Sequence, residues 1–296
     1  MEKTVQKKHL KIPVSKIIIV ALLILYLLWL FVPFYVVFIT SFVSDAELQS
    51  TMSFVWFPKQ FVFDAYKTVF TEDMYVQNGF LAISSLIVGF LNSMWISIVQ
   101  VGCSLVFGGL AAYSYSKVEF IGKNKIFMLQ LATMMIPMGS LTVISYVFYD
   151  AIGWTHTFLP LIIPGMFGGA SMIFFLRSYF DQISSEFVEA AKIDGLGNLG
   201  AYFCVMMPIA VPAFAAQFIF AFVGSFNNLA GPLLYLYPGD PATYTLQVVL
   251  SEMRDQYSSA AVTSAVALVG IIPLVIVYAF TQKFFIEGIA VGGVKG

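Results

Sequence analysis

The chain has 296 residues, of which 59% are hydrophobic and 10% are charged, and its formal net charge is −1. Soluble globular domains carry about 25% charged residues, so this composition excludes an ordinary soluble protein and predicts a polytopic membrane protein. The two cysteines, Cys103 and Cys204, do not have a spacing typical of a metal site or a disulfide framework.

Six apolar runs follow a basic N-terminal tail at residues 1–16. The first run, 17–43, is too long for a signal-peptide core and lacks a small-residue cleavage site, so we expect it to remain as an anchor. It would extend roughly 40 Å against a hydrocarbon core of about 30 Å, which predicts a tilt or a bend near Pro33. The other runs are long enough to cross as helices, at about 80–115, 126–149, 158–180, 206–236 and 260–285.

Basic residues predict the orientation of these six spans. With the N-terminal tail in the cytoplasm, only three of the 15 Lys and Arg residues fall outside, namely Lys59, Lys67 and Arg254. Cytoplasmic segments carry the excess of Lys and Arg, so this count favours cytoplasmic N- and C-termini. The spanning domain would then cover 17–285, with external loops at 44–79 and 237–259 and a cytoplasmic tail at 286–296.

A polar segment at 181–208 lies on the predicted cytoplasmic side, between the fourth and fifth runs. Ser184 or Ser185 is suited to cap a helix whose first turns carry Glu186 and Glu189, where the helix dipole favours acids. Gly195 is suited to the left-handed conformation that ends such a helix. Spacings of three and four place one ring and small side chains on one face: Phe187, Ala190, Ala191 and Asp194. The segment is therefore predicted to form a docking surface. The alternative is a solvated loop whose acidic residues serve only to keep it hydrated.

Glu189-Ala190-Ala191, three residues, Gly195, nine residues, then Val205, Met207 and Pro208 resembles the EAA loop of permease subunits of ABC importers. Asp194-Gly195 is similar to the carbohydrate branch of that family, although members usually have Trp where Phe226 stands. The resemblance extends to further positions along the chain: Asn92-Ser93, Ala111-Ala112-Tyr113, Pro137, Phe226-Asn227-Asn228 and the C-terminal glycines.

The resemblance implies an all-α membrane fold of six helices, the type I ABC importer permease fold, in the cell membrane of a prokaryote. It implies a second permease subunit, two cytoplasmic ATPase subunits that bind ATP and Mg, and an extracytoplasmic solute-binding protein. The residues expected to couple to the ATPase are Ser185, Glu186, Phe187, Glu189, Ala190, Ala191, Asp194 and Gly195. The C-terminal residues expected to contact the ATPase are Gly292, Gly293, Val294, Lys295 and Gly296. The alternative is a frayed terminus that makes no such contact.

Polar side chains inside the spans are candidates for the solute pathway, because their burial in hydrocarbon is costly without a partner. For Asn92, a hydrogen bond between helices is favoured over contact with solute. For Asn227-Asn228, near the helix-breaking Pro212 and Pro232, packing and pathway roles remain equally open. The candidate pathway residues are Asn92, Gln217, Phe226, Asn227 and Asn228, and Gln100 is a further polar group in a span.

The sequence contains no GxxxxGK[ST] phosphate loop, so we expect a non-catalytic subunit without its own metal or cofactor, and energy from a partner. The histidines, His9 and His156, form no catalytic constellation, and no nucleic-acid partner is expected. An ATP-independent secondary carrier or channel is the alternative, but no span carries a buried carboxylate suited to an ion relay. A membrane scaffold without transport is a second alternative. Carbohydrate is the expected solute, an oligosaccharide or a sugar derivative, as implied by the resemblance.

Overall fold

The computed structural model describes residues 14–51, 54–71, 75–78, 81–257 and 259–292. The chain divides into two compact units, of which the first comprises residues up to 69 together with 257–268 and the second comprises 70–256 with residues from 269 onward.

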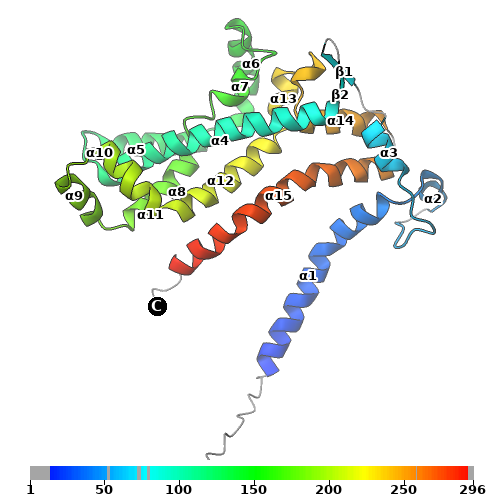
Figure 1. Ribbon diagram of the computed structural model, residues 1–296, viewed down its shortest axis with the longest axis horizontal. Helices are drawn as coiled ribbons and strands as arrows, with labels where there is room; N and C mark the ends of the chain where they lie inside the picture. The colour runs from blue at the N-terminus through cyan, green and yellow to red at the C-terminus, as the bar shows by residue number, and fades with distance from the viewer. Residues whose placement is uncertain (1–13, 52–53, 72–74, 79–80, 258, 293–296) are drawn as a thin grey trace, which may run out of the picture. The chain divides into compact units, whose positions relative to one another are not determined.

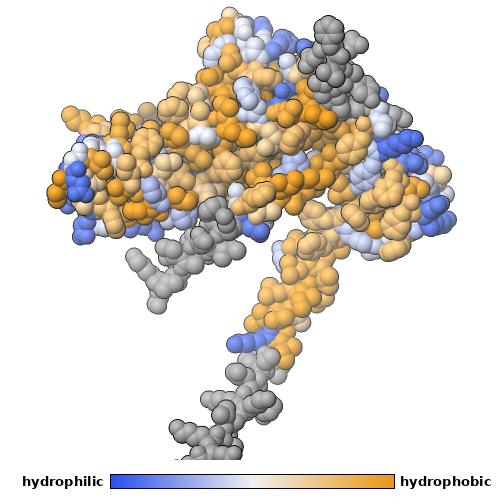
Figure 2. All heavy atoms as spheres, viewed as in Figure 1, coloured by the Kyte–Doolittle hydropathy of each residue, from blue (hydrophilic) through white to orange (hydrophobic). Residues whose placement is uncertain are grey.

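The first unit contains a long apolar helix and a small polar cap. Helix α1 (Val14–Thr40) continues through Pro33, and its side chains from Ser15 to Tyr35 are exposed. Figure 2 shows that this helix is hydrophobic along most of its length, as expected of a helix surrounded by lipid. The short helix α2 (Asp45–Ser50) follows, and its Ser44 N-cap hydroxyl accepts a hydrogen bond from the Glu47 amide at 3.3 Å.

The second unit is built around α4 (Ser85–Lys117), which runs beside α12 (Val211–Phe226), as Figure 1 shows. Helices α8 (Ala170–Asp181) and α14 (Leu246–Gln256) also pack on α4. Before α4, strands β1 (Tyr75–Asn78) and β2 (Leu81–Ser84) pair antiparallel, with Tyr75 opposite Ser84. Apart from this hairpin the described elements are helical, which agrees with the all-α expectation, and the helix expected from about residue 80 begins at Ser85.

Glycines on α4 permit the close approach of its neighbours. Gly168, at φ +80°, lies so near α4 that an added Cβ would be 2.9 Å from the Gly108 Cα. Gly109 lies beneath the Phe214 ring and the Tyr202 hydroxyl. Small residues let helices approach closely where hydrocarbon offers no hydrophobic driving force, so these contacts account for much of the packing in this unit.

Breaks interrupt three of the six predicted spans. In the described part of the chain, the helices long and apolar enough to cross are α1, α4 and α15 (Ala260–Gly292), and up to five crossings result if two bent helix pairs also count. Run 158–180 divides into α7 (Leu159–Ile162) and α8, whose 12 residues extend only about 18 Å. The positive φ of Gly168 falls between them, which explains the break.

The two bent pairs each turn by 81°. One pair joins α5 (Lys123–Ala132) and the 3-10 turn η1 (Thr133–Met135) to η2 (Met138–Leu141) and α6 (Thr142–Ala151). The other joins α10 (Asn198–Ala201), the π-helical turn η3 (Tyr202–Met206) and α11 (Met207–Ile209) to α12. Pro208 and Pro212 flank this second bend and lack the amide hydrogen that a continuous helix uses, so run 206–236 is not one straight helix.

The remaining elements refine the predicted loops. The predicted external loop 237–259 begins after α13 (Ala230–Tyr235) and contains the 3-10 turn η4 (Pro241–Thr243) and helix α14. The predicted loop 44–79 contains α2, α3 (Asp64–Thr71) and β1. Helix α15 continues to Gly292, so the first residues of the tail predicted at 286–296 are helical.

We predict that Gly109→Ala destabilises the protein. The new Cβ would lie 2.7 Å from two ring carbons of Phe214, and overpacking of this kind costs about 1–3 kcal/mol. The matched control is Gly102→Ala on the same helix, where an added Cβ has no neighbour within 4 Å and alanine favours the helix by roughly 0.5–1 kcal/mol. Thermal unfolding of the detergent-purified variants, followed by tryptophan fluorescence, measures the difference. Equal midpoints would contradict the packing described for α4.

Candidate functional site

The predicted docking segment folds as a short helix that leaves α8 at a turn. Helix α9 comprises Glu186–Ile193. The Ser184 hydroxyl accepts a hydrogen bond from the Glu186 amide at 3.3 Å, whereas Ser185 at the N-cap makes no side-chain capping bond. Of the two serines predicted to cap this helix, Ser184 therefore does so.

The end of α9 is a Schellman motif, as predicted from Gly195. This glycine has φ +87°, and its amide donates to the Lys192 carbonyl at 3.1 Å. The Leu196 amide donates to the Ala191 carbonyl at 2.9 Å. These two bonds satisfy carbonyls that a helix end otherwise leaves unpaired, and they fix the direction in which the chain leaves α9.

The inner face of α9 packs on its own chain. Val188 and Ala191 are each 4% exposed and belong to a core formed with α4, α8 and η3. The prediction that Ala191 belongs to the docking stripe with Phe187 and Ala190 is therefore corrected. Its methyl group is enclosed by the protein itself, and a partner cannot reach it.

The outer face of α9 remains open. Phe187, Glu189, Ala190 and Asp194 are exposed, as is Glu186. Sequence reasoning missed Ile193, whose side chain is 87% exposed, and Leu199 on α10, which is 65% exposed. Ile193 lies three and four residues after Ala190 and Glu189, so helical spacing was the signal that could have found it. We call these exposed residues of α9, together with Leu199, the coupling surface.

An aromatic cluster supports the coupling surface from within. The Tyr202 ring of η3 lies 5.4 Å from Tyr113 of α4 and 6.5 Å from Phe180 of α8, measured between centroids. Phe180 in turn lies 6.2 Å from Phe214 of α12. Edge-on and tilted ring pairs at these distances are favourable. The cluster therefore joins the helices that meet beneath α9.

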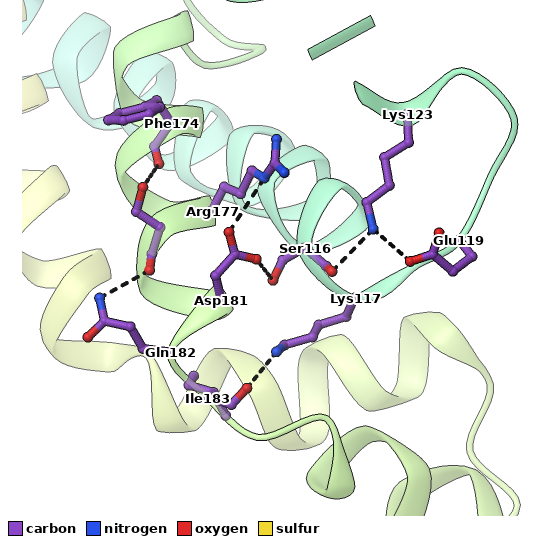
Figure 3. Close-up of polar contacts among 10 residues, drawn as sticks. Ser116, Lys117, Glu119, Lys123, Phe174, Arg177, Asp181, Gln182 and Ile183 are labelled. Carbon is purple, nitrogen blue, oxygen red and sulfur yellow. Dashed lines mark hydrogen bonds and ion pairs between the residues drawn. The ribbon is translucent and has the colours of Figure 1, made fainter. Parts of the chain in front are cut away.

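Polar contacts fasten α8 to α4 immediately before the turn into α9 (Figure 3). The Ser116 hydroxyl donates to Asp181 Oδ1 at 2.6 Å, and the Arg177 guanidinium pairs with Asp181 Oδ2 at 3.6 Å. Lys117 donates to the Ile183 carbonyl at 2.5 Å. The C-terminal end of α4 is thus joined to the end of α8 and the turn after it by one bond between side chains and one bond from a side chain to the backbone.

Helix α5 joins the same group of contacts. The Arg177 guanidinium carbon lies 3.9 Å from the centre of the Phe127 ring, a cation–π geometry. Lys123 Nζ lies 3.1 Å from Glu119 and donates to the Ser116 carbonyl at 3.3 Å, as Figure 3 shows. The ion pair between Arg177 and Asp181 could have been predicted from the sequence, because side chains four residues apart meet on one face of a helix.

A cavity of about 430 Å³ lies among α4, α8 and α12. Two predicted pathway residues, Gln217 and Asn228, line it, and so does Gln100. Sequence reasoning did not identify the serines that contribute to the same wall, because single hydroxyls are common on apolar helices. They are Ser104, Ser171 and Ser225.

The other predicted pathway residues lie elsewhere. Asn92 donates to the Ala242 and Tyr244 carbonyls, each at 2.9 Å, which supports the favoured interpretation of Asn92 as a packing residue. Phe226 is 1% exposed and stacks on Phe222, which corrects its assignment to the pathway. Asn227 is exposed and accepts a hydrogen bond from Gln247 at 3.2 Å.

The predicted contacts of the C-terminal tail with the ATPase cannot be placed. Gly292 is the last residue of α15, and Gly293, Val294, Lys295 and Gly296 lie outside the described residues. Within the residues that are described, no group of three or more His, Cys, Asp or Glu side chains is arranged to hold a metal ion.

The long apolar helices, the polar cavity and the exposed helix between α8 and α10 define a multi-pass membrane permease. Residues 104–290 match the family described as "Binding-protein-dependent transport system inner membrane component", and the chain belongs to this family. The resemblance to permease subunits of carbohydrate ABC importers is thereby confirmed, and the chain is a non-catalytic permease subunit.

Similar proteins carry sugar-transport names. The arabinooligosaccharides transport system permease protein of Halalkalibacterium halodurans is 31% identical over 260 residues, covering 87% of this chain and 88% of that protein. The polygalacturonan/rhamnogalacturonan transport system permease protein of Bacillus subtilis is 28% identical over 295 residues, covering 94% and 97%. In fold, the chain is similar to part of a bacterial ABC transporter involved in the import of the acidic polysaccharide alginate, with a TM-score of 0.76, 24% identity and coverage of 92% and 96%.

We predict that Gly195→Ala loosens the end of α9. A residue with a Cβ pays about 1–2 kcal/mol in the left-handed conformation, although the side chain itself would meet open space. Gly197→Ala is the matched control, because Gly197 has φ −74° and ψ 178° and is equally open. Hydrogen exchange of the purified protein over residues 186–200 should be faster in Gly195→Ala alone. Equal exchange in both variants would contradict the structural role of Gly195.

Proposed function

We propose that this chain is the transmembrane permease subunit of an ATP-driven sugar importer in a prokaryotic cell membrane. It would form half of the translocation pathway and move solute by alternating access. The observation that carries this proposal is the geometry of α9, where the family's Glu-Ala-Ala and Gly positions form a helix that is open on one face and anchored on the other.

The partners follow from the family. Its description names a binding-protein-dependent system and an inner membrane component, which supports an extracytoplasmic solute-binding protein above this chain. A second permease subunit would complete the pathway. Two cytoplasmic ATPase subunits would bind ATP and Mg, because this chain has no phosphate loop of its own.

The proposed solute is an oligosaccharide or a sugar derivative. The similar permeases are named for arabinooligosaccharides, maltodextrin and galactooligosaccharides, which share this chemistry although their sugars differ. The aromatic content of 17% adds no argument, because aromatic residues are also enriched at membrane interfaces.

The coupling surface is the proposed contact with the ATPase. Phe187, Ala190 and Ile193 would fill an apolar cleft of that subunit, and Glu189 would pair with a basic residue there. A charged pair of this kind contributes about 1.5 kcal/mol or more when it is desolvated and close to nothing when it stays exposed. Because Val188 and Ala191 pack in the core, a displacement of α9 caused by the ATPase would be transmitted to α4 and α8.

We predict that Glu189→Lys and Gly195→Pro uncouple ATP hydrolysis from uptake. The first reverses the charge at the proposed contact, and the second cannot adopt the positive φ of Gly195. Glu119→Lys is the control, because it makes the same charge change on a side chain that is 90% exposed and outside α9. ATP hydrolysis and labelled-sugar uptake in proteoliposomes of the whole importer measure the coupling. Full uptake by both variants at normal membrane levels would refute the role of α9, and uptake without ATP would favour a secondary carrier or channel.

Six spans with both termini in the cytoplasm remain part of the proposal. We predict that a membrane-impermeant maleimide labels Gln256→Cys in intact cells and labels Glu119→Cys only after permeabilisation. Both positions are exposed, and both variants are made with Cys103 and Cys204 replaced by alanine. Labelling of Glu119→Cys in intact cells would reverse the orientation and place α9 on the side away from ATP.

A further inference from the structure

The cavity among α4, α8 and α12 is lined by polar groups that carry no charge. Its polar groups are the amides of Gln100, Gln217 and Asn228 and the hydroxyls of serines, and the described residues that line it include no charged side chain. Phe220 adds an aromatic ring to the lining. Its volume of about 430 Å³ lies in the range of roughly 300–1,000 Å³ that is typical of small-molecule sites.

Two of these polar groups have no hydrogen-bond partner among the residues that the structure describes. The structure records no hydrogen bond from the side chains of Gln217 and Ser171 to any described residue, although both line the cavity. By contrast, the Asn228 carbonyl oxygen accepts from the Gly231 amide at 3.0 Å. An amide and a hydroxyl that line a cavity without partners call for water or a solute with its own donors and acceptors.

A second, smaller pocket continues this polar surface toward α14. Its volume is about 10 Å³, and it shares Gln100, Ser225 and Asn228 with the large cavity. The Ser97 and Thr245 hydroxyls line it, are buried, and have no hydrogen-bond partner among the described residues. The Ser225 hydroxyl donates to Gln100 Oε1 at 2.6 Å, so this bond forms the wall common to both pockets.

We propose that the cavity binds an uncharged sugar unit of the transported saccharide, with Gln217 and Ser171 as contacts. The Gln100–Ser225 hydrogen bond separates this site from the smaller pocket, whose volume of about 10 Å³ has room for about one water molecule. This inference rests on the proposed transport function and adds to it the class of substrate, a neutral saccharide.

The wall chemistry distinguishes neutral from acidic sugars. Sugar hydroxyls both donate and accept hydrogen bonds, as do glutamine amides and serine hydroxyls. Each hydrogen bond that the sugar loses with water is therefore replaced by one to the cavity wall. A uronic acid carries a carboxylate, and a charge buried without a paired cation is strongly disfavoured. Neither Lys nor Arg lines the described cavity, so it provides no such cation. An acidic oligosaccharide would therefore be excluded from this half of the pathway.

Cysteine protection tests the site in the assembled importer, purified through a tag on this chain from its native host. In a background without Cys103 and Cys204, Gln217→Cys is treated with a water-soluble methanethiosulfonate. The probes are three neutral trisaccharides, arabinotriose, maltotriose and galactotriose, and the acidic trigalacturonate. A neutral trisaccharide at about ten times its Kd should slow labelling about tenfold, and trigalacturonate should not. The control is Val223→Cys, which is exposed on α12 but does not line the cavity.

Transport kinetics supply a second readout. Gln217→Leu should raise the KM for the protecting trisaccharide roughly three- to tenfold, the value of one lost hydrogen bond, while Gln256→Leu outside the cavity should not change it. Protection by trigalacturonate, or ATP-driven uptake of a neutral sugar with no protection and an unchanged KM, would overturn this inference and leave the transport function standing. Absence of ATP-driven uptake of all four probes would count against the transport function itself.

Discussion

The packing of α9 on the aromatic cluster is the interaction that holds the candidate site against the rest of the second unit. Val188 and Ala191 place one face of the helix against the core that contains Tyr113, Phe180 and Tyr202. A helix of eight residues is too short to be stable by itself, so its shape comes from this tertiary contact and from the Schellman motif at its end. Rings from α4, α8 and η3 meet there, and α4 and α8 also enclose the cavity.

The sequence was most informative where local chemistry alone decides the conformation. The left-handed glycine at the end of α9 and the helix that precedes it were both predictable, since capping and residue spacing are local properties. Helix α14 was predictable too, because Leu246, Val249, Leu250 and Met253 recur at intervals of three and four, but its position between polar turns suggested a loop.

Features that depend on distant partners could not be predicted. Val188 and Phe187 are both apolar, and only the fold determines that the first is buried and the second exposed. Gln100 and Ser225 are 125 positions apart, so no local pattern reveals their hydrogen bond. Hydropathy located the apolar runs, but it could not show that glycines and prolines divide run 158–180 and bend run 206–236, because these residues are also common in continuous membrane helices.

The uncharged wall of the cavity has a consequence for bioenergetics. Each elementary charge that crosses a membrane potential of 100 mV gains or loses about 2.3 kcal/mol. Amides and hydroxyls, together with a neutral sugar, carry no net charge through this field. The free energy needed to move such a solute through this half of the pathway would then be independent of the membrane potential. The solute gradient would depend on ATP supply, even in a cell whose membrane potential has collapsed.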